Sequence, residues 1–164
     1  MRKQIFMAIA RKLLTIPTID YVDLWNDNGA NFAGGSVFPL PAVFVEFEAI
    51  EWHQQGNAAR RADCNVRLHV LRRASSSLHG ATDPAMAEAL ARFDLLDDIA
   101  AAMQRLRGEN FAGFMHTLSA TNHAHAEIIE DVECFRTSVQ DTTAMPARYP
   151  SRLSLTPKMV PHGS

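Results

Sequence analysis

The segment 61–73 restricts the possible folds of this chain more than any other feature, because it alternates between apolar and polar side chains. Ala62, Cys64, Val66, Leu68 and Val70 occupy every second position. Successive side chains of a strand point to opposite faces, so this pattern predicts a strand with one buried face and one polar face. The chain is therefore expected to build a sheet that is covered on one side.

A second strand is predicted over residues 42–52, just before the first. Val43, Val45, Phe47 and Ala49 share the face that we expect to be core. Residues 53–60 form a polar linker with a turn at Gly56-Asn57, which predicts an antiparallel hairpin. On its outer face the charged side chains are expected to meet across the strands, with Glu46 and Glu48 facing Arg67, Arg72 or Arg73.

Two helices are expected. In the first, over residues 5–14, Ile5, Ile9 and Leu13 recur at helical spacing before Pro17 ends the helix. A longer helix is predicted over residues 84–107, with Asp83 as N-cap and Gly108 as C-cap. Its apolar stripe, expected to pack on the sheet, consists of Met86, Leu90, Phe93, Leu96, Ala100, Met103 and Leu106.

Both helices also carry charged faces. The first has Arg2, Lys3, Arg11 and Lys12, which form either a solvated surface or a contact with an acidic partner. The second has Asp94, Asp97 and Asp98 opposite its apolar stripe, an arrangement that is most simply a solvated face.

The remaining elements complete an α+β fold. Further strands are predicted over residues 18–25, 114–121 and 127–139, with His116, Leu118 and Ala120 on one face. The expected architecture is one mainly antiparallel sheet, with the N-terminal helix and the long helix packed on the face that carries Val43 and Val66. We predict a single domain over residues 1–140 and an extended, proline-rich tail over residues 141–164.

Composition excludes several classes of protein. The 164 residues carry a net charge of −2, which is unfavourable for general binding to nucleic acid. Glycines and prolines interrupt the longest uncharged stretch, over residues 28–45, so no membrane span is expected. A secretory signal is not expected either, because the apolar run after Arg2 and Lys3 covers only residues 5–10. Cys64 and Cys134 match no metal or redox spacing and are predicted to be free buried thiols in a reducing compartment.

Catalytic motifs are scarce in the sequence. A phosphate-binding loop, a dinucleotide fingerprint and a nucleophile elbow are all absent. His123 and His125 could bind a metal from one strand face, although a solvated turn is the simpler interpretation. The serines at 75–77 lie near His79 and Asp83 but lack the rigid nucleophile and oxyanion hole of a triad. We expect no catalytic centre, no cofactor and no bound transition metal.

The outer face of the hairpin leaves two interpretations open. Large apolar groups beside charges are typical of a protein interface. Alternatively, the first helix, the loop 26–41 or the tail covers this face. The candidate interface residues are Phe44, Glu46, Glu48, Ile50, Trp52, Arg67, Arg72 and Arg73.

Two segments of this hairpin carry a family resemblance. The stretch L-P-A-V-F-V-E-F, followed by a polar linker and R-A-D-C-N-V-R-L-H-V-L, resembles the tail-terminator and tail-completion proteins of long-tailed phages and prophages. In that family an N-terminal helix precedes the first of these strands, and a long helix and two final strands follow the second. The resemblance covers about residues 1–140 and includes no catalytic motif, and the loop 26–41 and the tail 141–164 have no counterpart in it.

The resemblance implies a structural role. Such proteins form a ring, usually of six subunits, that caps the finished tail tube and presents a surface to the head. The implied partners are further copies of the chain, the tail tube protein and a head-completion protein, without a membrane or a specific nucleic acid. The implied location is the virion, and the host cytoplasm during assembly. A head–tail connector or neck protein, an uncharacterised small enzyme that uses His116, His123 and His125, and a ligand-binding α+β domain remain alternatives.

Overall fold

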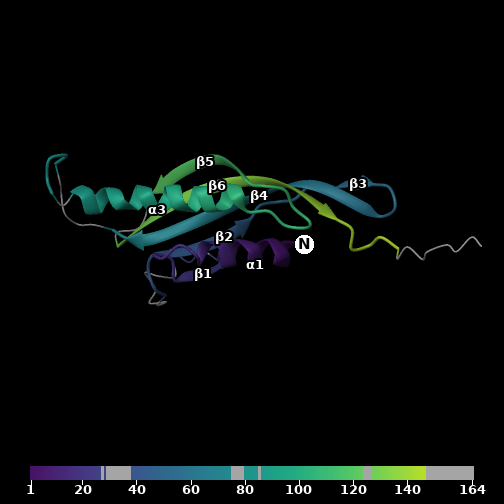
Figure 1. The fold of residues 1–164 in the computed structure, drawn as a ribbon, viewed down its shortest axis with the longest axis horizontal. Helices are drawn as coiled ribbons and strands as arrows, with labels where there is room; N and C mark the ends of the chain where they lie inside the picture. Colours follow the sequence, from purple (N-terminus) through teal and green to yellow (C-terminus); the bar gives the residue numbers. More distant parts are fainter. Residues whose placement is uncertain (27, 29–37, 75–79, 85, 124–126, 147–164) are drawn as a thin grey trace, which may run out of the picture.

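The computed structural model describes residues 1–26, 28, 38–74, 80–84, 86–123 and 127–146, except for the side chain of residue 88. Two helices and six strands follow one another along the described chain (Figure 1). In chain order they are α1 (Arg2–Leu13), β1 (Tyr21–Leu24), β2 (Ala42–Phe47), β3 (His53–Gln55), β4 (Ala59–Arg73), α3 (Met86–Arg105), β5 (Met115–Asn122) and β6 (Ile128–Asp141).

The strands form one mixed sheet in the order β1-β2-β4-β6-β5, and β3 pairs with β4 at one end. The predicted β2–β4 hairpin is confirmed, with Val43 opposite Val70 and Val45 opposite Leu68. β1 runs parallel to β2, which makes the sheet mixed, so the expected mainly antiparallel sheet is matched only roughly. The other pairings are antiparallel, and the α+β class is confirmed.

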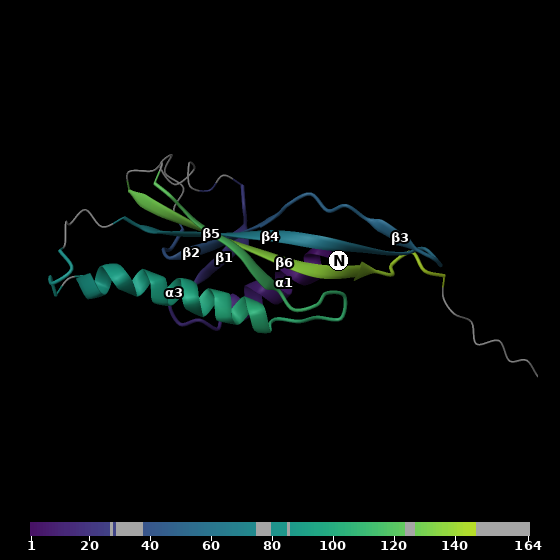
Figure 2. The same ribbon diagram turned by 90° about the horizontal axis from the view of Figure 1, so that it is seen from above.

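Both helices cover the same face of the sheet, as predicted (Figure 2). α1 contacts β1, and α3 contacts β5 and β6, so each helix lies toward a different edge. Val43, Val45, Val66 and Leu68 are buried in the main core beneath the helices. The predicted anchors of α1, Ile5, Ile9 and Leu13, are also fully buried there.

The predicted strand 42–52 is wrong beyond Phe47. β2 ends at that residue, and residues 48–52 are irregular before β3 begins. β3 then pairs with the start of β4 through a turn in which Asn57 and Ala58 have φ values of 55° and 61°. This break ends the simple alternation, so residues beyond it do not follow the two faces that a continuous strand would have.

α3 is shorter than predicted, and its apolar stripe is only partly core. Met103 is fully buried and Leu96 is half-buried against the core. Leu90 and Phe93, which were predicted to pack on the sheet, are 49% and 45% exposed. The start of α3 extends past the main body of the sheet in Figure 2, which explains why the same apolar spacing is buried only toward its C-terminal end.

The loop after α3 closes one end of β6. Ala112 donates its backbone N–H to the carbonyl of Ser138, and Gln140 donates to Asn110. The prediction of Gly108 as the C-cap of the long helix is wrong, because α3 ends at Arg105, and Gly108 instead lies against the ring of Phe111. A β-carbon at Gly108 would lie 2.2 Å from Cε1 of that ring.

A β-bulge in β5 overturns part of its predicted face pattern. His116 pairs with Phe135, but Leu118 pairs with the next residue of β6, Cys134. The shift places Leu118 on the opposite face from His116, although the alternation predicted a shared face. Ser119, which pairs with Glu133, takes that place beside His116.

Candidate interface surfaces

The sheet face away from the helices carries a second, smaller core. Phe44 lies in this core with Ala42, Leu71 and Ile128. Phe44 is 0% exposed, so its prediction as an exposed interface residue is wrong. Aromatic rings of Tyr21, Trp25 and Phe38 surround it at centroid distances of 5.0–6.2 Å. Of the covers that the sequence left open, the loop 26–41 contributes Phe38 and Leu40, whereas Tyr21 and Trp25 precede that loop.

Two other predicted interface residues, Ile50 and Trp52, are also displaced from the outer face. Both are half-buried against the main core because the strand breaks at Phe47. The guanidinium of Arg60 lies 4.4 Å from the centroid of the Trp52 ring. The apolar part of the predicted surface is thus internal or packed within the chain.

The charged part of the predicted surface is partly assembled. Arg67 lies on β4 opposite Glu46, and its guanidinium is 3.7 Å from Glu46 and 2.5 Å from Glu48. This confirms the predicted cross-strand pairing for these three residues. On the same face Arg136 of β6 forms an ion pair with Asp63, and this contact lowers the pKa of Asp63.

The other two predicted arginines do not join this group. Arg72 lies on the helix-covered face, and its Nε is 3.0 Å from the buried carboxylate of Asp131. Arg73 is exposed at the end of β4. We call the remaining outer cluster of Glu46, Glu48 and Arg67 the charged face.

A buried histidine lies beside the charged face, on the same side of the sheet. Nδ1 of His69 is 2.5 Å from Glu130, and Nε2 is 3.0 Å from Glu46. The side chain of His69 is only 8% exposed. A neutral imidazole can donate a hydrogen bond from one nitrogen only, so both contacts require a proton on the ring or on one carboxyl group. The contacts fix Glu46, and with it the acceptor of Arg67.

A second polar cluster on the helix-covered face was not found from the sequence. Glu133, which is buried on β6, accepts a hydrogen bond from Ser119 at 2.6 Å and lies 2.5 Å from Nε2 of His116. Ser119 is 3.2 Å from the same nitrogen. A catalytic triad needs the acid and the serine on different ring nitrogens, so this cluster lacks triad geometry. The bulge at β5 creates it, and no motif in the sequence marks such a bulge.

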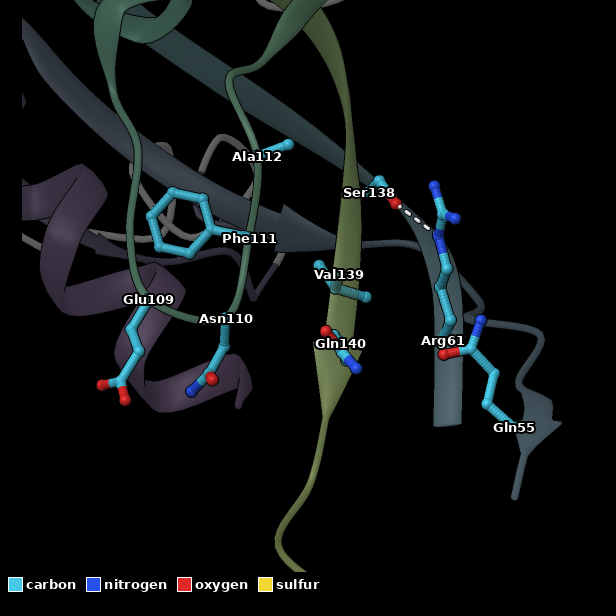
Figure 3. Close-up of a pocket in the computed structure, with 9 residues that line it drawn as sticks. All are labelled: Gln55, Arg61, Glu109, Asn110, Phe111, Ala112, Ser138, Val139 and Gln140. Atoms are coloured by element: carbon cyan, nitrogen blue, oxygen red, sulfur yellow. Dashed lines mark hydrogen bonds between the residues drawn. The ribbon is translucent and has the colours of Figure 1, made fainter. Parts of the chain in front are cut away.

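Two hollows of about 340 Å³ each open on the surface. One lies between α3 and β5, where Phe93, Leu96 and Asp97 face the Glu133 cluster. The other lies beside the end of β6, where Figure 3 shows the loop 109–112 on one side and Arg61 and Gln55 on the other. Arg61 donates a hydrogen bond to Ser138 there.

The other candidate residues give no assembled centre in the described part of the chain. Residues 75–79 and 124–126, which include the serines, His79 and His125, lie outside the described residues, and His123 is exposed. Among described residues, no group of three or more His, Cys, Asp and Glu side chains is placed to hold a metal, and no helix is long and apolar enough to cross a membrane.

Cys64 and Cys134 are free thiols, as predicted. Cys64 is buried, and burial raises the pKa of its thiol to about 11. Cys134 is only half-buried, and burial raises its pKa as well. The prediction that both thiols are buried is therefore correct only for Cys64.

Comparisons with known proteins give little further information. No protein-family model and no curated protein matches the sequence. Among solved structures, the chain is similar to one described as "Virion of native gene transfer agent (GTA) particle", with 14% identity and a TM-score of 0.39. The match covers 82% of this chain and 93% of that chain. Such values establish neither a shared family nor a shared function.

Proposed function

We propose that this chain is a structural protein of a phage-like virion, of the tail-terminator type. It forms a ring on the end of the finished tail tube and offers a surface to the head. Its partners are then further copies of the chain, the tail tube protein and a head-completion protein. It acts in the host cytoplasm during assembly and stays in the virion afterwards.

The two sequence segments that carry the family resemblance support this proposal through their placement. They form β2 and β4, which pair from Ala42 opposite Leu71 to Phe47 opposite Val66. The observation that carries the proposal is the charged face on this pair, in which Arg67 lies between two carboxylates. The main core lies on the opposite face of these strands and the smaller core lies beside the charged face, so the strands that carry the charges are held on both faces.

Fixed charges on a rigid sheet suit a docking role. Complementary charges on two surfaces set orientation and reject wrong partners more than they add affinity. Phe44 is buried in the core, so it is not available as the apolar contact that was expected on the charged face. We therefore propose that the charged face orients the subunit on the tail tube or the head-completion protein. The apolar contact between subunits is then made by another surface.

Charge reversal at Arg67 tests this role. Arg67→Glu places a third carboxylate between Glu46 and Glu48, and we expect it to abolish capping, so that tails grow beyond their normal length in electron micrographs. Glu109→Lys, an exposed reversal in the loop after α3, is the matched control and should leave tail length unchanged. Circular dichroism and melting temperature would establish that both variants fold.

Normal tail lengths with folded Arg67→Glu protein would contradict the role of the charged face. Binding of the wild-type protein to portal complexes, together with failure to bind tube ends, would instead support a head–tail connector. Because those two partners are purified separately, one co-sedimentation experiment with each distinguishes the two functions.

A further inference from the structure

The exposed sides of the two helices carry matching patterns of apolar and charged residues. On α1, one side presents the α1 stripe, which consists of Lys3, Met7, Arg11 and Leu14. On α3, the α3 stripe consists of the exposed residues Leu90, Phe93, Asp94 and Asp97, of which Phe93 and Asp97 also line the hollow beside β5. Each member of a stripe has another member three or four residues away, so each stripe is continuous along one helix surface.

Both stripes are open to solvent. Met7, Leu14, Leu90 and Phe93 are among the large apolar side chains that remain exposed in the described chain. Leu14 follows the last residue of α1 but keeps helical angles, with φ −66° and ψ −4°. Each stripe therefore combines two exposed apolar groups with two charges of one sign.

The charges in the two stripes have no partner within the described part of the chain. Lys3 and Arg11 are not in any of its ion pairs, and neither are Asp94 and Asp97. Where α1 and α3 meet within one chain, other residues face each other, namely Lys12 beside Asp98 and Arg105. The stripes are thus separate from the contact that the two helices already share.

We propose that the α1 stripe of one copy of this chain docks on the α3 stripe of a second copy. The apolar pairs then supply the burial that the charged face lacks, and Lys3 and Arg11 meet Asp94 and Asp97. Arg92, whose guanidinium lies 4.3 Å from the centroid of the Phe93 ring, borders the contact and adds one positive charge beside the acidic pair. The electrostatic interaction between the two stripes remains attractive.

This contact uses different surfaces on its two sides. Each copy keeps one free stripe after the first contact, so further copies add until the assembly closes into a ring or extends as a filament. Ring closure rests on the proposed function, whereas the pairing of stripes rests on the exposed residues alone. Neither stripe takes part in the charged face, so one subunit can use both surfaces together.

Paired charge reversals test the docking. One variant carries Lys3→Glu and Arg11→Glu, and the other carries Asp94→Lys and Asp97→Lys. Each variant alone brings like charges together, and we expect its self-association to weaken on the order of tenfold or more by analytical ultracentrifugation. A mixture of the two variants restores opposite charges at every contact, so we expect it to regain the wild-type assembly. Glu51→Lys, an exposed reversal outside both stripes, is the control and should associate normally.

A cross-linking experiment locates the contact. A carbodiimide couples an amine to a carboxylate without a spacer, and a mixture of ¹⁴N- and ¹⁵N-labelled wild-type chains identifies links between copies. We expect mixed-isotope peptides that join Lys3 to Asp94 or Asp97.

Wild-type protein that stays monomeric both at its highest soluble concentration and on tube ends, or a mixture that fails to regain assembly, would overturn the docking. Tube capping by reversal variants that cannot pair would overturn the docking but leave the proposed function standing. Pairing of the stripes in a protein that does not bind tube ends would support the docking and contradict the proposed function.

Discussion

The indole of Trp25 is stacked on the imidazole of His69, with 3.8 Å between the ring centroids and 6° between the ring planes. Trp25 follows β1 directly, and His69 lies in the middle of β4, with β2 between those strands. The stack therefore crosses β2 and covers a histidine whose two nitrogens contact Glu46 and Glu130. The indole thus covers one face of a buried imidazole, while the partner carboxylate of Glu46 stays partly exposed.

Removing this cover should destabilise the protein. We expect Trp25→Ala to lower the free energy of unfolding by about 2 kcal/mol, because it removes a large ring and opens the His69 network to solvent. Trp25→Phe keeps an aromatic face and should lose less than half as much. Urea unfolding measures both, and equal losses for the two variants would mean that the stack contributes little.

The two ends of α3 should differ strongly in their contribution to stability. Met103 is fully buried, and Met103→Ala should cost about 2–5 kcal/mol. Leu90 is half exposed, and Leu90→Ala in the monomer should cost less than about 1 kcal/mol. The half-buried Leu96 should fall between them. Thermal unfolding at low protein concentration, where copies do not associate, is the appropriate measurement, and a large loss at Leu90 would place that residue in the core.

Gly108 should not tolerate a side chain. A β-carbon there would overlap the Phe111 ring, which is itself buried beside Phe114 at a centroid distance of 5.6 Å. We expect Gly108→Ala to lower the melting temperature, with an unfolding cost of about 1–3 kcal/mol. Gly56→Ala is the matched control, since no atom lies within 4 Å of its β-carbon position. Similar melting temperatures for the two variants would show that the loop 108–112 can shift to accommodate the added methyl group at little cost in stability.

Acid should weaken the end of the sheet where Asp141 lies. Hydrogen bonds from the side chain and backbone of Thr143, and then from Arg60, hold the pKa of Asp141 well below its ordinary value. A carboxylate with a lower pKa in the folded state stabilises the fold above about pH 4, and this contribution is lost as the pH falls through the folded-state value.

The variant Asp141→Asn isolates this contribution. Its urea midpoint should lie below that of the wild type at pH 6, and the difference should shrink at pH 3. Asp20→Asn, which changes an exposed carboxylate outside the ion pairs of the described chain, should show no such convergence. A constant difference between Asp141→Asn and the wild type across this range would contradict the assignment.

Periodicity was sufficient to predict the elements that carry the main core. The alternation in β4 and the four-residue spacing of Ile5, Ile9 and Leu13 reflect burial on one face only, and the structure places those residues accordingly. The same reasoning left open whether Phe44 is an exposed interface residue or is covered by another part of the chain. Tyr21, Trp25 and Phe38 cover it from outside the strand, and local alternation contains no information about such a cover.

The candidate surface was predictable only where it depends on local pairing. Opposite charges at adjacent hairpin positions predicted the contacts of Arg67 with Glu46 and Glu48. The break after Phe47 and the bulge in β5 each alter which side chains share a face. No residue pattern in this sequence marks either irregularity of the backbone. The burial of Met103 and exposure of Leu90 depend on where the sheet ends beneath α3, which a helical repeat does not reveal.

The pairing of β4 with β6 joins two parts of the chain that are synthesised far apart in time. The two strands pair over their full length, and Arg60 contacts Asp141 across 81 positions of the chain. Such a distant closure is slow compared with the local β2–β4 turn. On the ribosome, β4 emerges long before β6, so the nascent chain holds a hairpin with an unpaired central edge until nearly the whole sequence has been synthesised. We expect that edge to be the place where chaperones bind and where truncated chains aggregate.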